Sequence, residues 1–539
     1  MSTATASGPR AGAGPDGGRA GLGQLVHAEW TKFRTVRGWV IGMIVAAVLT
    51  MLVGVFAAAN ASIGCQAGPN GPQLTGRACL PHVPVGPGGE AVSDSFYFVH
   101  QPLPVNGSIT ARVTSLTGRY AAGNQRVPSG SQGPSLTPGL GPWAKGGIMI
   151  KASTRPGSAY AAMMVTGGHG VRMQYDYVSD IAGRPGRVAA ASPRWLRLTR
   201  SGDTITGYDS VNGRNWTKVG TAQLAGLPAT AQAGLFAASP GYTKTSTSFG
   251  GGQNQGGPAQ ATGVFDHVRV SAAPAGRAWT GTAIGGGGPV AAARGFTQSG
   301  GAVTVTGSGD IAPLVPGPGN GIPTTTIGQS LGGLFIGLIA IVVVATMFFT
   351  AEYRRGLIRT TLAAAPGRGR VLAAKAVVIG AVAFAAGLAA AIVAIVIGVP
   401  RAESQGQFLL PASALADVRV VAGTAAMVGL CAVFAVAVGA VLRRSAAAVT
   451  VVIVLVVLPF LLAALNVFPS GVSNWLLSVT PAAGLAIEQS IPHYSQVQAV
   501  YSVVGGYYPL APGAGLAVLC AWVAAALGLA FVLLRRRDA

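Results

Sequence analysis

The chain has 539 residues, of which 50% are hydrophobic and only 10% are charged. Soluble proteins usually carry roughly 25% charged residues, so this composition excludes an ordinary soluble globular protein. The formal net charge of +22 suits a nucleic-acid-binding protein, but the apolar residues form long uninterrupted runs with cations at their ends. This pattern excludes nucleic acid as a partner and predicts a chain that lies in a lipid bilayer.

The N-terminal region divides into two parts before the first apolar run. Residues 1–20 are rich in Gly, Ala and Pro, which predicts a disordered cytoplasmic tail. Residues 21–38 predict an amphipathic helix that lies on the membrane surface, although a polar lead-in to the first span is the alternative. Its expected apolar face consists of Leu22, Leu25, Val26, Trp30, Phe33 and Val36, with Glu29, Lys32, Arg34 and Arg37 on the other faces.

Six apolar segments are long enough to cross a bilayer, which takes about 20 residues per helix. Charged residues occur only near the ends of these segments, and Lys375 is expected to extend back to the interface. The fold predicted is a polytopic α-helical membrane protein with six transmembrane helices. The predicted spans are 39–59, 330–350, 372–397, 420–442, 446–467 and 513–534.

The distribution of cations sets the expected orientation. Basic residues precede span one, occur in the loop 351–371 between spans two and three, lie between spans four and five, and follow span six. The loops on the opposite side hold Arg401 and Arg419 near the membrane. The positive-inside rule then places both termini in the cytoplasm of a multi-pass plasma-membrane protein. No cleavable signal peptide is evident. Residues 60–329 are therefore expected to be extracellular.

This large outer region is predicted to be an all-β sandwich or jelly roll. Alternating apolar residues predict strands at 108–115, 171–177 and 263–270, and Asn212-Gly213 is a strong hairpin signal. Residues 194–220 (RWLRLTRSGDTITGYDSVNGRNWTKVG), with GLFAAS and FDHVRV further on, resemble the concanavalin A-like lectin/glucanase superfamily in its laminin-G-like or DUF1349-like branch. The resemblance covers about 92–272. Residues 273–326 are expected to add two strands and a flexible linker.

Aromatic residues and cysteines give the outer region its candidate sites. Trp143, Trp195 and Trp216 are candidate surfaces for glycan stacking, although they also suit a sandwich core. Glycosidases normally use two carboxylates, and the region has one glutamate and no clustered acid pair, which disfavours a hydrolase. Cys65 and Cys79 are a candidate disulfide if this side of the membrane is oxidising.

No motif for catalysis, metal binding or ATP binding occurs in the chain. The phosphate-binding pattern GxxxxGK[ST] is absent, as are HExxH, CxxC and GxSxG, and the six histidines are scattered. We therefore expect no catalytic residue, no metal ligand and no cofactor in this chain.

Two motifs carry a second resemblance. AEWTKFRTVR before the first span and TAEYRRGLIRTTLAAAPGRGRVLAAK after the second are similar to actinobacterial ABC-2 type transporter permeases. The resemblance implies a transmembrane subunit. The partners that it implies are a second permease copy, as homo- or heterodimer, and a separate ATPase subunit that binds ATP and Mg²⁺. It also implies that the following residues face that ATPase: Glu29, Trp30, Lys32, Arg34, Glu352, Tyr353, Arg354, Arg355, Gly356 and Arg359.

Residues 475–491 resemble the outer re-entrant helices of the same family. Thr480-Pro481 is a typical helix start, and Glu488 is either a functional group near the outer membrane face or a solvated charge. The function predicted is therefore an ATP-driven exporter permease, with an extracellular glycan or protein as a candidate ligand of the sandwich. A lectin-like surface receptor anchored by six helices is the alternative.

Overall fold

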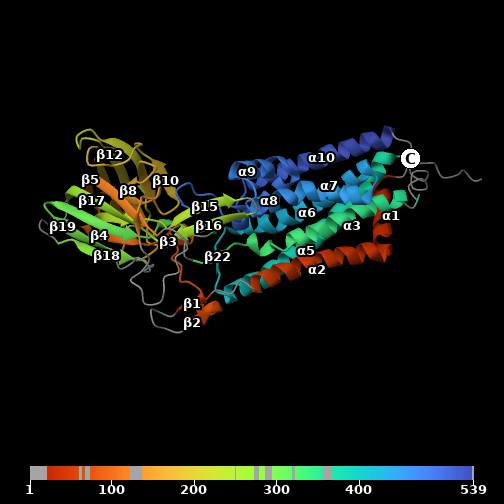
Figure 1. Cartoon of the computed structure of the whole chain (residues 1–539), viewed down its shortest axis with the longest axis horizontal. Helices are drawn as coiled ribbons and strands as arrows, with labels where there is room; N and C mark the ends of the chain where they lie inside the picture. The colour runs from red at the N-terminus through yellow and green to blue at the C-terminus, as the bar shows by residue number, and fades with distance from the viewer. Residues whose placement is uncertain are drawn as a thin grey trace, which may run out of the picture.

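The computed structural model describes residues 21–59, 64–66, 73–121, 136–248, 251–271, 278–285, 294–317, 322–354, 356, 367–499 and 501–536. Figure 1 shows an elongated molecule with a β-rich body at one end and a helical bundle at the other. Helix α1 (Leu22–Thr35) and the last residues of helix α10 (Pro512–Arg536) lie at the end of the bundle that is remote from the β-rich body. The predicted disordered tail, residues 1–20, lies outside the described residues.

Six helical segments of the described chain are long and apolar enough to cross a membrane. The fifth of these consists of two consecutive helices, and a further helix, α1, precedes the first span. The helices are α1 (Leu22–Thr35), α2 (Arg37–Ala59), α3 (Leu334–Arg354), α5 (Arg368–Ser404), α6 (Ala414–Leu442), α7 (Ser445–Val456), α8 (Leu458–Ala464), α9 (Ser470–Val479) and α10 (Pro512–Arg536).

Local sequence explains where these helices begin and break. Helix α6 starts at Ala414, earlier than the predicted span, because the Ser413 hydroxyl accepts a 3.2 Å hydrogen bond from the backbone N–H of Ala416 and caps the helix. The fifth span is divided between α7 and α8 next to Pro459. A proline lacks the N–H that continues a helix and its ring collides with the preceding turn.

Two antiparallel sheets form the β-rich body. The seven-stranded sheet has the order β10 (Ser179–Ala182), β9 (Val171–Tyr175), β8 (Tyr160–Thr166), β7 (Lys145–Lys151), β14 (Ala231–Ala238), β4 (Phe96–Leu103), β18 (Thr280–Ile284). The second sheet has the order β13 (Thr217–Gln223), β12 (Thr204–Ser210), β11 (Arg194–Ser201), β5 (Asn106–Tyr120), β17 (Ala259–Ser271), β20 (Ala302–Ser308), β19 (Gly295–Ser299), with β6 (Thr137–Pro138) paired to β5.

Alternation along the strands builds the core between the sheets. Ile109, Ala111 and Val113 of β5 are fully buried, and they pack with inward residues of β7 and β11 such as Ile148 and Leu196. The second hydrophobic cluster lies on the other face of the seven-stranded sheet, where β3 (Val92–Asp94) and β21 (Ile311–Pro313) contribute to it. The segments that enter and leave the sandwich therefore cover that face.

The sandwich departs from the sequence-based expectation at two points. The strand expected over 171–177 ends at Tyr175, because Asp176 and Tyr177 adopt positive φ values of 45° and 64° and turn the chain. The sandwich also continues past residue 272, since β18 joins one sheet and β19 and β20 join the other. Most of the flexible linker expected around 273–293 lies outside the described residues.

Short elements join the sandwich to the helical bundle. A small core contains Leu314 from the end of the sandwich together with Leu410, Ile491 and Tyr507 from loops between the spans. The Gln496 side chain donates hydrogen bonds to the backbone carbonyls of Tyr177 and Val178. The parallel pair β22 (Thr324–Thr325) and β23 (Phe408–Leu409) adds a further link, so the two bodies are in direct contact.

Candidate functional site

Four ionisable residues meet where α1 contacts the bundle, at the end remote from the sandwich. Glu29 and Lys32 belong to α1, Glu352 to the last turn of α3, and Lys375 to the third turn of α5. Glu29 is 3% exposed and Lys375 is completely buried. We call these four residues the charged junction.

The ion pairs of the charged junction join all three helices. The Lys375 ammonium lies 2.7 Å from Glu29 Oε2 and 2.7 Å from Glu352 Oε1. The Lys32 ammonium lies 2.8 Å from Glu29 Oε1 and 3.3 Å from Glu352 Oε1. Each lysine therefore bridges both carboxylates, and two positive charges balance two negative ones.

The groups around these ion pairs stabilise them. Burial opposes the charged form of Lys32, but hydrogen bonds and charges from Glu29 and Glu352 outweigh it and raise the pKa of the Lys32 ammonium. The Lys375 ammonium lies 4.9 Å from the centre of the Phe348 ring, which adds a cation–π contact. Removal of any one of the four residues leaves an unbalanced charge in a buried cluster, at a cost of about 3–5 kcal/mol. The four residues therefore hold α1 against α3 and α5.

This arrangement corrects two expectations. Lys375 does not extend to solvent, because Glu29 and Glu352 bind its ammonium and the side chain is buried. Glu29 and Glu352 do not face outward for a partner, because both carboxylates are occupied by lysines. The sequence contained one feature that could have predicted this pairing. Lys375 lies within an apolar span, two helical turns after a basic loop that contains a single acid, and a charge inside a span usually has a partner.

The other residues expected at a partner surface have separate positions. Trp30 is 43% exposed and Arg34 is exposed on α1. Leu22 and Val36 of the expected apolar face are exposed as well, whereas Phe33 packs into the bundle core. Tyr353 is partly buried and Gly356 is exposed. The Arg354 side chain, Arg355 and Arg359 lie outside the part of the chain that the structure describes.

The outer segment before the last span is not one helix over 475–491. Helix α9 ends at Val479, and a 3-10 helix, η4 (Pro481–Glu488), follows with every residue buried. Gly484 and Gly515 permit close packing, because an added Cβ would lie 2.7 Å from Leu519 Cδ2 and 2.2 Å from the Ala483 carbonyl oxygen, respectively. Segment η4 is therefore seated against α10.

Glu488 is buried, so it is not a solvated charge. It is 6% exposed, it interacts by a hydrogen bond with the Tyr508 hydroxyl, and its Oε1 atom is buried without a hydrogen-bond partner. Burial raises the pKa of the Glu488 carboxyl to about 8, and the Tyr508 hydrogen bond opposes this shift.

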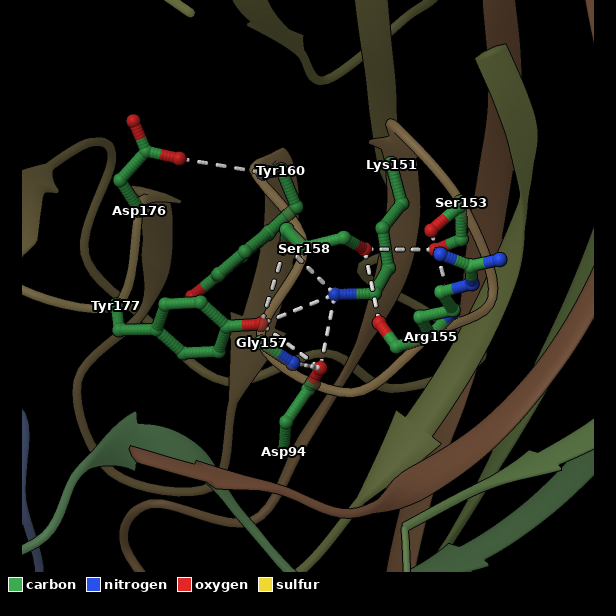
Figure 2. Close-up of polar contacts among 9 residues, drawn as sticks. All are labelled: Asp94, Lys151, Ser153, Arg155, Gly157, Ser158, Tyr160, Asp176 and Tyr177. Carbon is green, nitrogen blue, oxygen red and sulfur yellow. Dashed lines mark hydrogen bonds and ion pairs between the residues drawn. The ribbon is translucent and has the colours of Figure 1, made fainter. Parts of the chain in front are cut away.

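A second buried ion pair lies in the sandwich close to its contact with the bundle (Figure 2). The Lys151 ammonium lies 2.9 Å from Asp94 Oδ2, and both side chains are fully buried. The same carboxylate oxygen accepts hydrogen bonds from the Tyr177 hydroxyl at 2.7 Å and the Gly157 N–H at 2.8 Å. These contacts tie β3 to β7 and explain why the chain turns sharply at Tyr177.

The three candidate stacking tryptophans differ in access. Trp143 is 6% exposed and its ring lies 4.0 Å from that of His169, so it offers no open face for a sugar. Trp195 and Trp216 are partly exposed, and the Arg197 guanidinium lies 4.0 Å from the centre of the Trp216 ring. Neither tryptophan belongs to the core between the sheets as its described residues define it.

The cysteines and the possible metal ligands are the last groups at the candidate sites. A disulfide joins Cys65 and Cys79, whereas Cys431 is a buried free thiol and Cys520 an exposed one. Among the described residues, no group of three or more His, Cys, Asp or Glu side chains is arranged to hold a metal ion.

Comparison with known proteins identifies a family that matches the helical part of the chain. The model of a family described as ABC-2 family transporter protein matches residues 218–539. This range begins at β13 in the sandwich and includes every predicted span except the first. No curated protein matches the chain.

Solved structures match the chain only over part of its length. The GH43 protein BlXynB from Bacillus licheniformis is 14% identical with a TM-score of 0.18, over 31% of this chain and 27% of that chain. A scytalido-glutamic peptidase with a transition state analog inhibitor is 9% identical with a TM-score of 0.24, over 40% of this chain and 98% of that chain. A lectin from Bauhinia forficata in complex with GalNAc is 10% identical with a TM-score of 0.17, over 38% and 91%. Scores this low carry no argument about function.

Proposed function

Because the chain belongs to the ABC-2 transporter family, we propose that it is the transmembrane permease subunit of an ATP-driven exporter whose ATP hydrolysis takes place in a separate subunit. The family match and the six apolar helices support the permease assignment. The charged junction is the observation that supports coupling to such a partner, because it fastens a surface helix to two spans.

The proposed orientation places the charged junction in the cytosol and the sandwich outside the cell. The distribution of cations supports this orientation. In the structure, α1 and the last residues of α10 lie at the end of the bundle opposite the sandwich (Figure 1). A cytoplasmic ATPase would then meet α1 first.

In this mechanism α1 transmits the movement of the ATPase. Trp30 and Arg34 form its exposed contact surface, and Glu29 on the inner side of the same helix is held by Lys375 of α5. Displacement of α1 therefore pulls on α5 through Lys375 and on α3 through Lys32 and Glu352. Helix α5 spans 37 residues from Arg368 to Ser404, so a tilt at its inner end reaches the outer loops beneath the sandwich.

Two further parts of the proposal concern the assembly. Family membership supports pairing with a second permease copy, identical or related. The contact between the sandwich and the outer loops, through the core around Leu410 and Tyr507, supports a sandwich that is fixed above the bundle. Trp195 and Trp216 are the candidate residues for a glycan or protein ligand there, because they keep partial exposure.

Purification of the full chain from its native membranes tests the proposed coupling. The wild type is expected to retain an ATP-hydrolysing subunit, and Arg34→Glu together with Trp30→Ala is expected to release it. Arg536→Glu, which reverses an exposed charge at the same end of the bundle, is the matched control and should retain the subunit. Retention of ATPase activity by the Trp30 and Arg34 variant would contradict docking at α1.

A further inference from the structure

A cavity opens beside the charged junction, between α3 and the start of α7. Its volume is about 460 Å³, and its walls come from the last turns of α3, the α6–α7 connection and the first turn of α7. The lining residues are Met347, Thr350, Ala351, Tyr353, Arg443, Arg444, Ser445 and Ala446. The cavity thus combines two adjacent arginines with small and apolar groups.

Two donors on this wall are unused. The Arg443 Nε atom and the Tyr353 hydroxyl are both buried from solvent and have no hydrogen-bond partner. The Arg443 guanidinium lies 5.0 Å from the centre of the Tyr353 ring, so the two groups are held together. A buried donor without an acceptor is costly, so an acceptor in the cavity that these side chains turned to meet would stabilise this wall.

The backbone at Arg443 adds a second argument. Arg443 ends helix α6 with φ 56° and ψ 9°, in the left-handed region, and its N–H donates to the Gly439 carbonyl. Glycine is the residue that suits this helix end, because it has no Cβ to strain the backbone. An arginine at this position presents a guanidinium to the cavity at a local cost, which suggests that the side chain is used.

Electrostatics selects an anionic ligand. No carboxylate lines the cavity among the described residues, and the nearest acid on α3, Glu352, pairs with Lys32 and Lys375. The backbone N–H groups of the first turn of α7 begin at this wall and favour negative charge. Arginines also bind phosphate oxygens through two parallel N–H donors.

From this geometry we propose that the cavity binds the phosphate headgroup of an anionic membrane lipid, with its acyl chains along the apolar side of α3 and α7. Placement of the lipid in the cytoplasmic leaflet rests on the orientation given under the proposed function. A site at the end of α3, level with the end of the apolar span, suits a lipid headgroup better than a soluble anion, since its wall includes the apolar side chains of Met347 and Ala446.

Lipid retention by the purified full chain tests this proposal without any measurement of transport or ATP hydrolysis. The protein is reconstituted in mixed phosphatidylcholine and phosphatidylglycerol, extracted in detergent, and its bound lipids are counted by native mass spectrometry. The wild type is expected to retain phosphatidylglycerol over phosphatidylcholine. Each neutralised arginine should lower that preference about fivefold, since a juxtamembrane cation contributes about 1 kcal/mol to binding of an anionic membrane.

Three variants and one control make the result specific. Arg443→Gly removes the guanidinium and suits the backbone, so it should lower the preference about fivefold without a lower unfolding temperature in phosphatidylcholine. Arg444→Gln should lower it to a similar extent, and Tyr353→Phe, which removes one hydroxyl, should weaken it less. Arg536→Gln changes the charge equally at the same end of the bundle and should behave as the wild type.

Four results would overturn the proposal. The first is equal retention of both lipids by the wild type, and the second is an unchanged preference in the Arg443 and Arg444 variants. The third is displacement of phosphatidylglycerol by inorganic phosphate or glycerol phosphate, which would assign the cavity to a soluble anion. The fourth is loss of a co-purifying ATPase by these variants with lipid retention unchanged, which would assign the cavity to the protein partner.

Discussion

The ammonium group of Lys375 on α5 donates a 2.7 Å hydrogen bond to Glu29 on α1, a residue 346 positions earlier in the chain. Neither side chain has appreciable contact with solvent, with 0% exposure for Lys375 and 3% for Glu29. One contact thus closes the bundle between its first helix and its third span. It also holds α1 against α5.

Replacement of Lys375 by methionine should destabilise the protein strongly. Methionine fills most of the volume but leaves Glu29 without the ammonium that faces Oε2 and deprives Glu352 of one of its two lysines. The expected loss in unfolding free energy is about 3–5 kcal/mol, because Glu29 and Glu352 must then share the single ammonium of Lys32 and one buried negative charge is left unbalanced. Thermal unfolding of the purified chain in detergent measures the change.

A double variant separates this pairing from simple loss of packing. Lys375→Met combined with Glu29→Gln removes opposite charges together, so it should be less destabilised than the sum of the single variants. Lys218→Met on an exposed strand of the sandwich is the control and should change stability by less than about 0.5 kcal/mol. Additive effects of Lys375 and Glu29 would contradict the junction.

Labelling with a membrane-impermeant thiol reagent should place the two ends of the molecule on opposite sides of the membrane. In a Cys520→Ser background, the remaining native cysteines are the Cys65–Cys79 disulfide and the buried Cys431. Asn212→Cys, in an exposed turn, should react in intact cells, whereas Arg370→Cys, exposed at the start of α5, should react only after permeabilisation. The reverse pattern would invert the proposed orientation and remove the basis for a cytosolic ATPase at α1.

The sequence predicted the helical bundle well because apolar length is a nearly complete description of a membrane span. Segments such as 330–350 therefore lie close to the helices observed. Periodicity carried less information in the sandwich. Strand β18 has only five residues, Thr280–Ile284, and its place at the edge of a sheet depends on pairing with β4, a contact that local sequence does not specify.

The candidate site was predicted only in part because charge signs do not reveal partners. The sequence placed Glu29 and Glu352 near a membrane surface, yet an outward and an inward carboxylate have the same local pattern. Only the packing of α1 on α3 and α5 shows that Lys375 lies between them. The burial of η4 was hidden in the same way, because its fit against α10 depends on Gly484 and Gly515 in two separate segments.

Acid should weaken the sandwich through Asp266. The Arg112 guanidinium donates to Asp266, with Nε 2.7 Å from Oδ1, and this hydrogen bond holds the pKa of the carboxyl below its usual range despite partial burial. A lowered pKa contributes stability that is present above the unfolded value, near 3.8, and is lost as the pH falls through the folded value. Asp266→Asn should therefore cost about 1–2 kcal/mol at neutral pH and nothing well below the folded pKa.

Denaturant unfolding followed by tryptophan fluorescence checks this difference, since Arg112 lies 5.7 Å from the centre of the Trp195 ring. The subtraction of the variant curve from the wild-type curve at each pH isolates Asp266 from other carboxyls. Arg112→Gln should reproduce the loss at neutral pH, and the double variant should add little to it. A difference that persists unchanged at acidic pH would show that the interaction does not depend on the ionised carboxylate.

Glu488 should give the opposite dependence on pH. Burial raises the pKa of its carboxyl from 4.5 to about 8, so the folded chain binds a proton more tightly than the unfolded chain does. The stability from this proton is complete below pH 4.5, decreases as the pH rises from there, and is lost above about pH 8. The wild type should therefore become less stable across this window.

Glu488→Gln tests the assignment because the amide keeps the shape and the hydrogen-bonding capacity of the protonated acid. The variant should unfold at nearly the same temperature as the wild type at pH 5 and at a higher temperature at pH 8, where the wild type must bury a carboxylate. Gln489→Glu, which adds an acid next to η4 at a partly buried position, provides a contrast and should not flatten the pH profile. If Glu488→Gln left the slope between pH 5 and pH 8 unchanged, the carboxyl would be ionised in the folded protein, and its partner would have to be a cation supplied from outside η4.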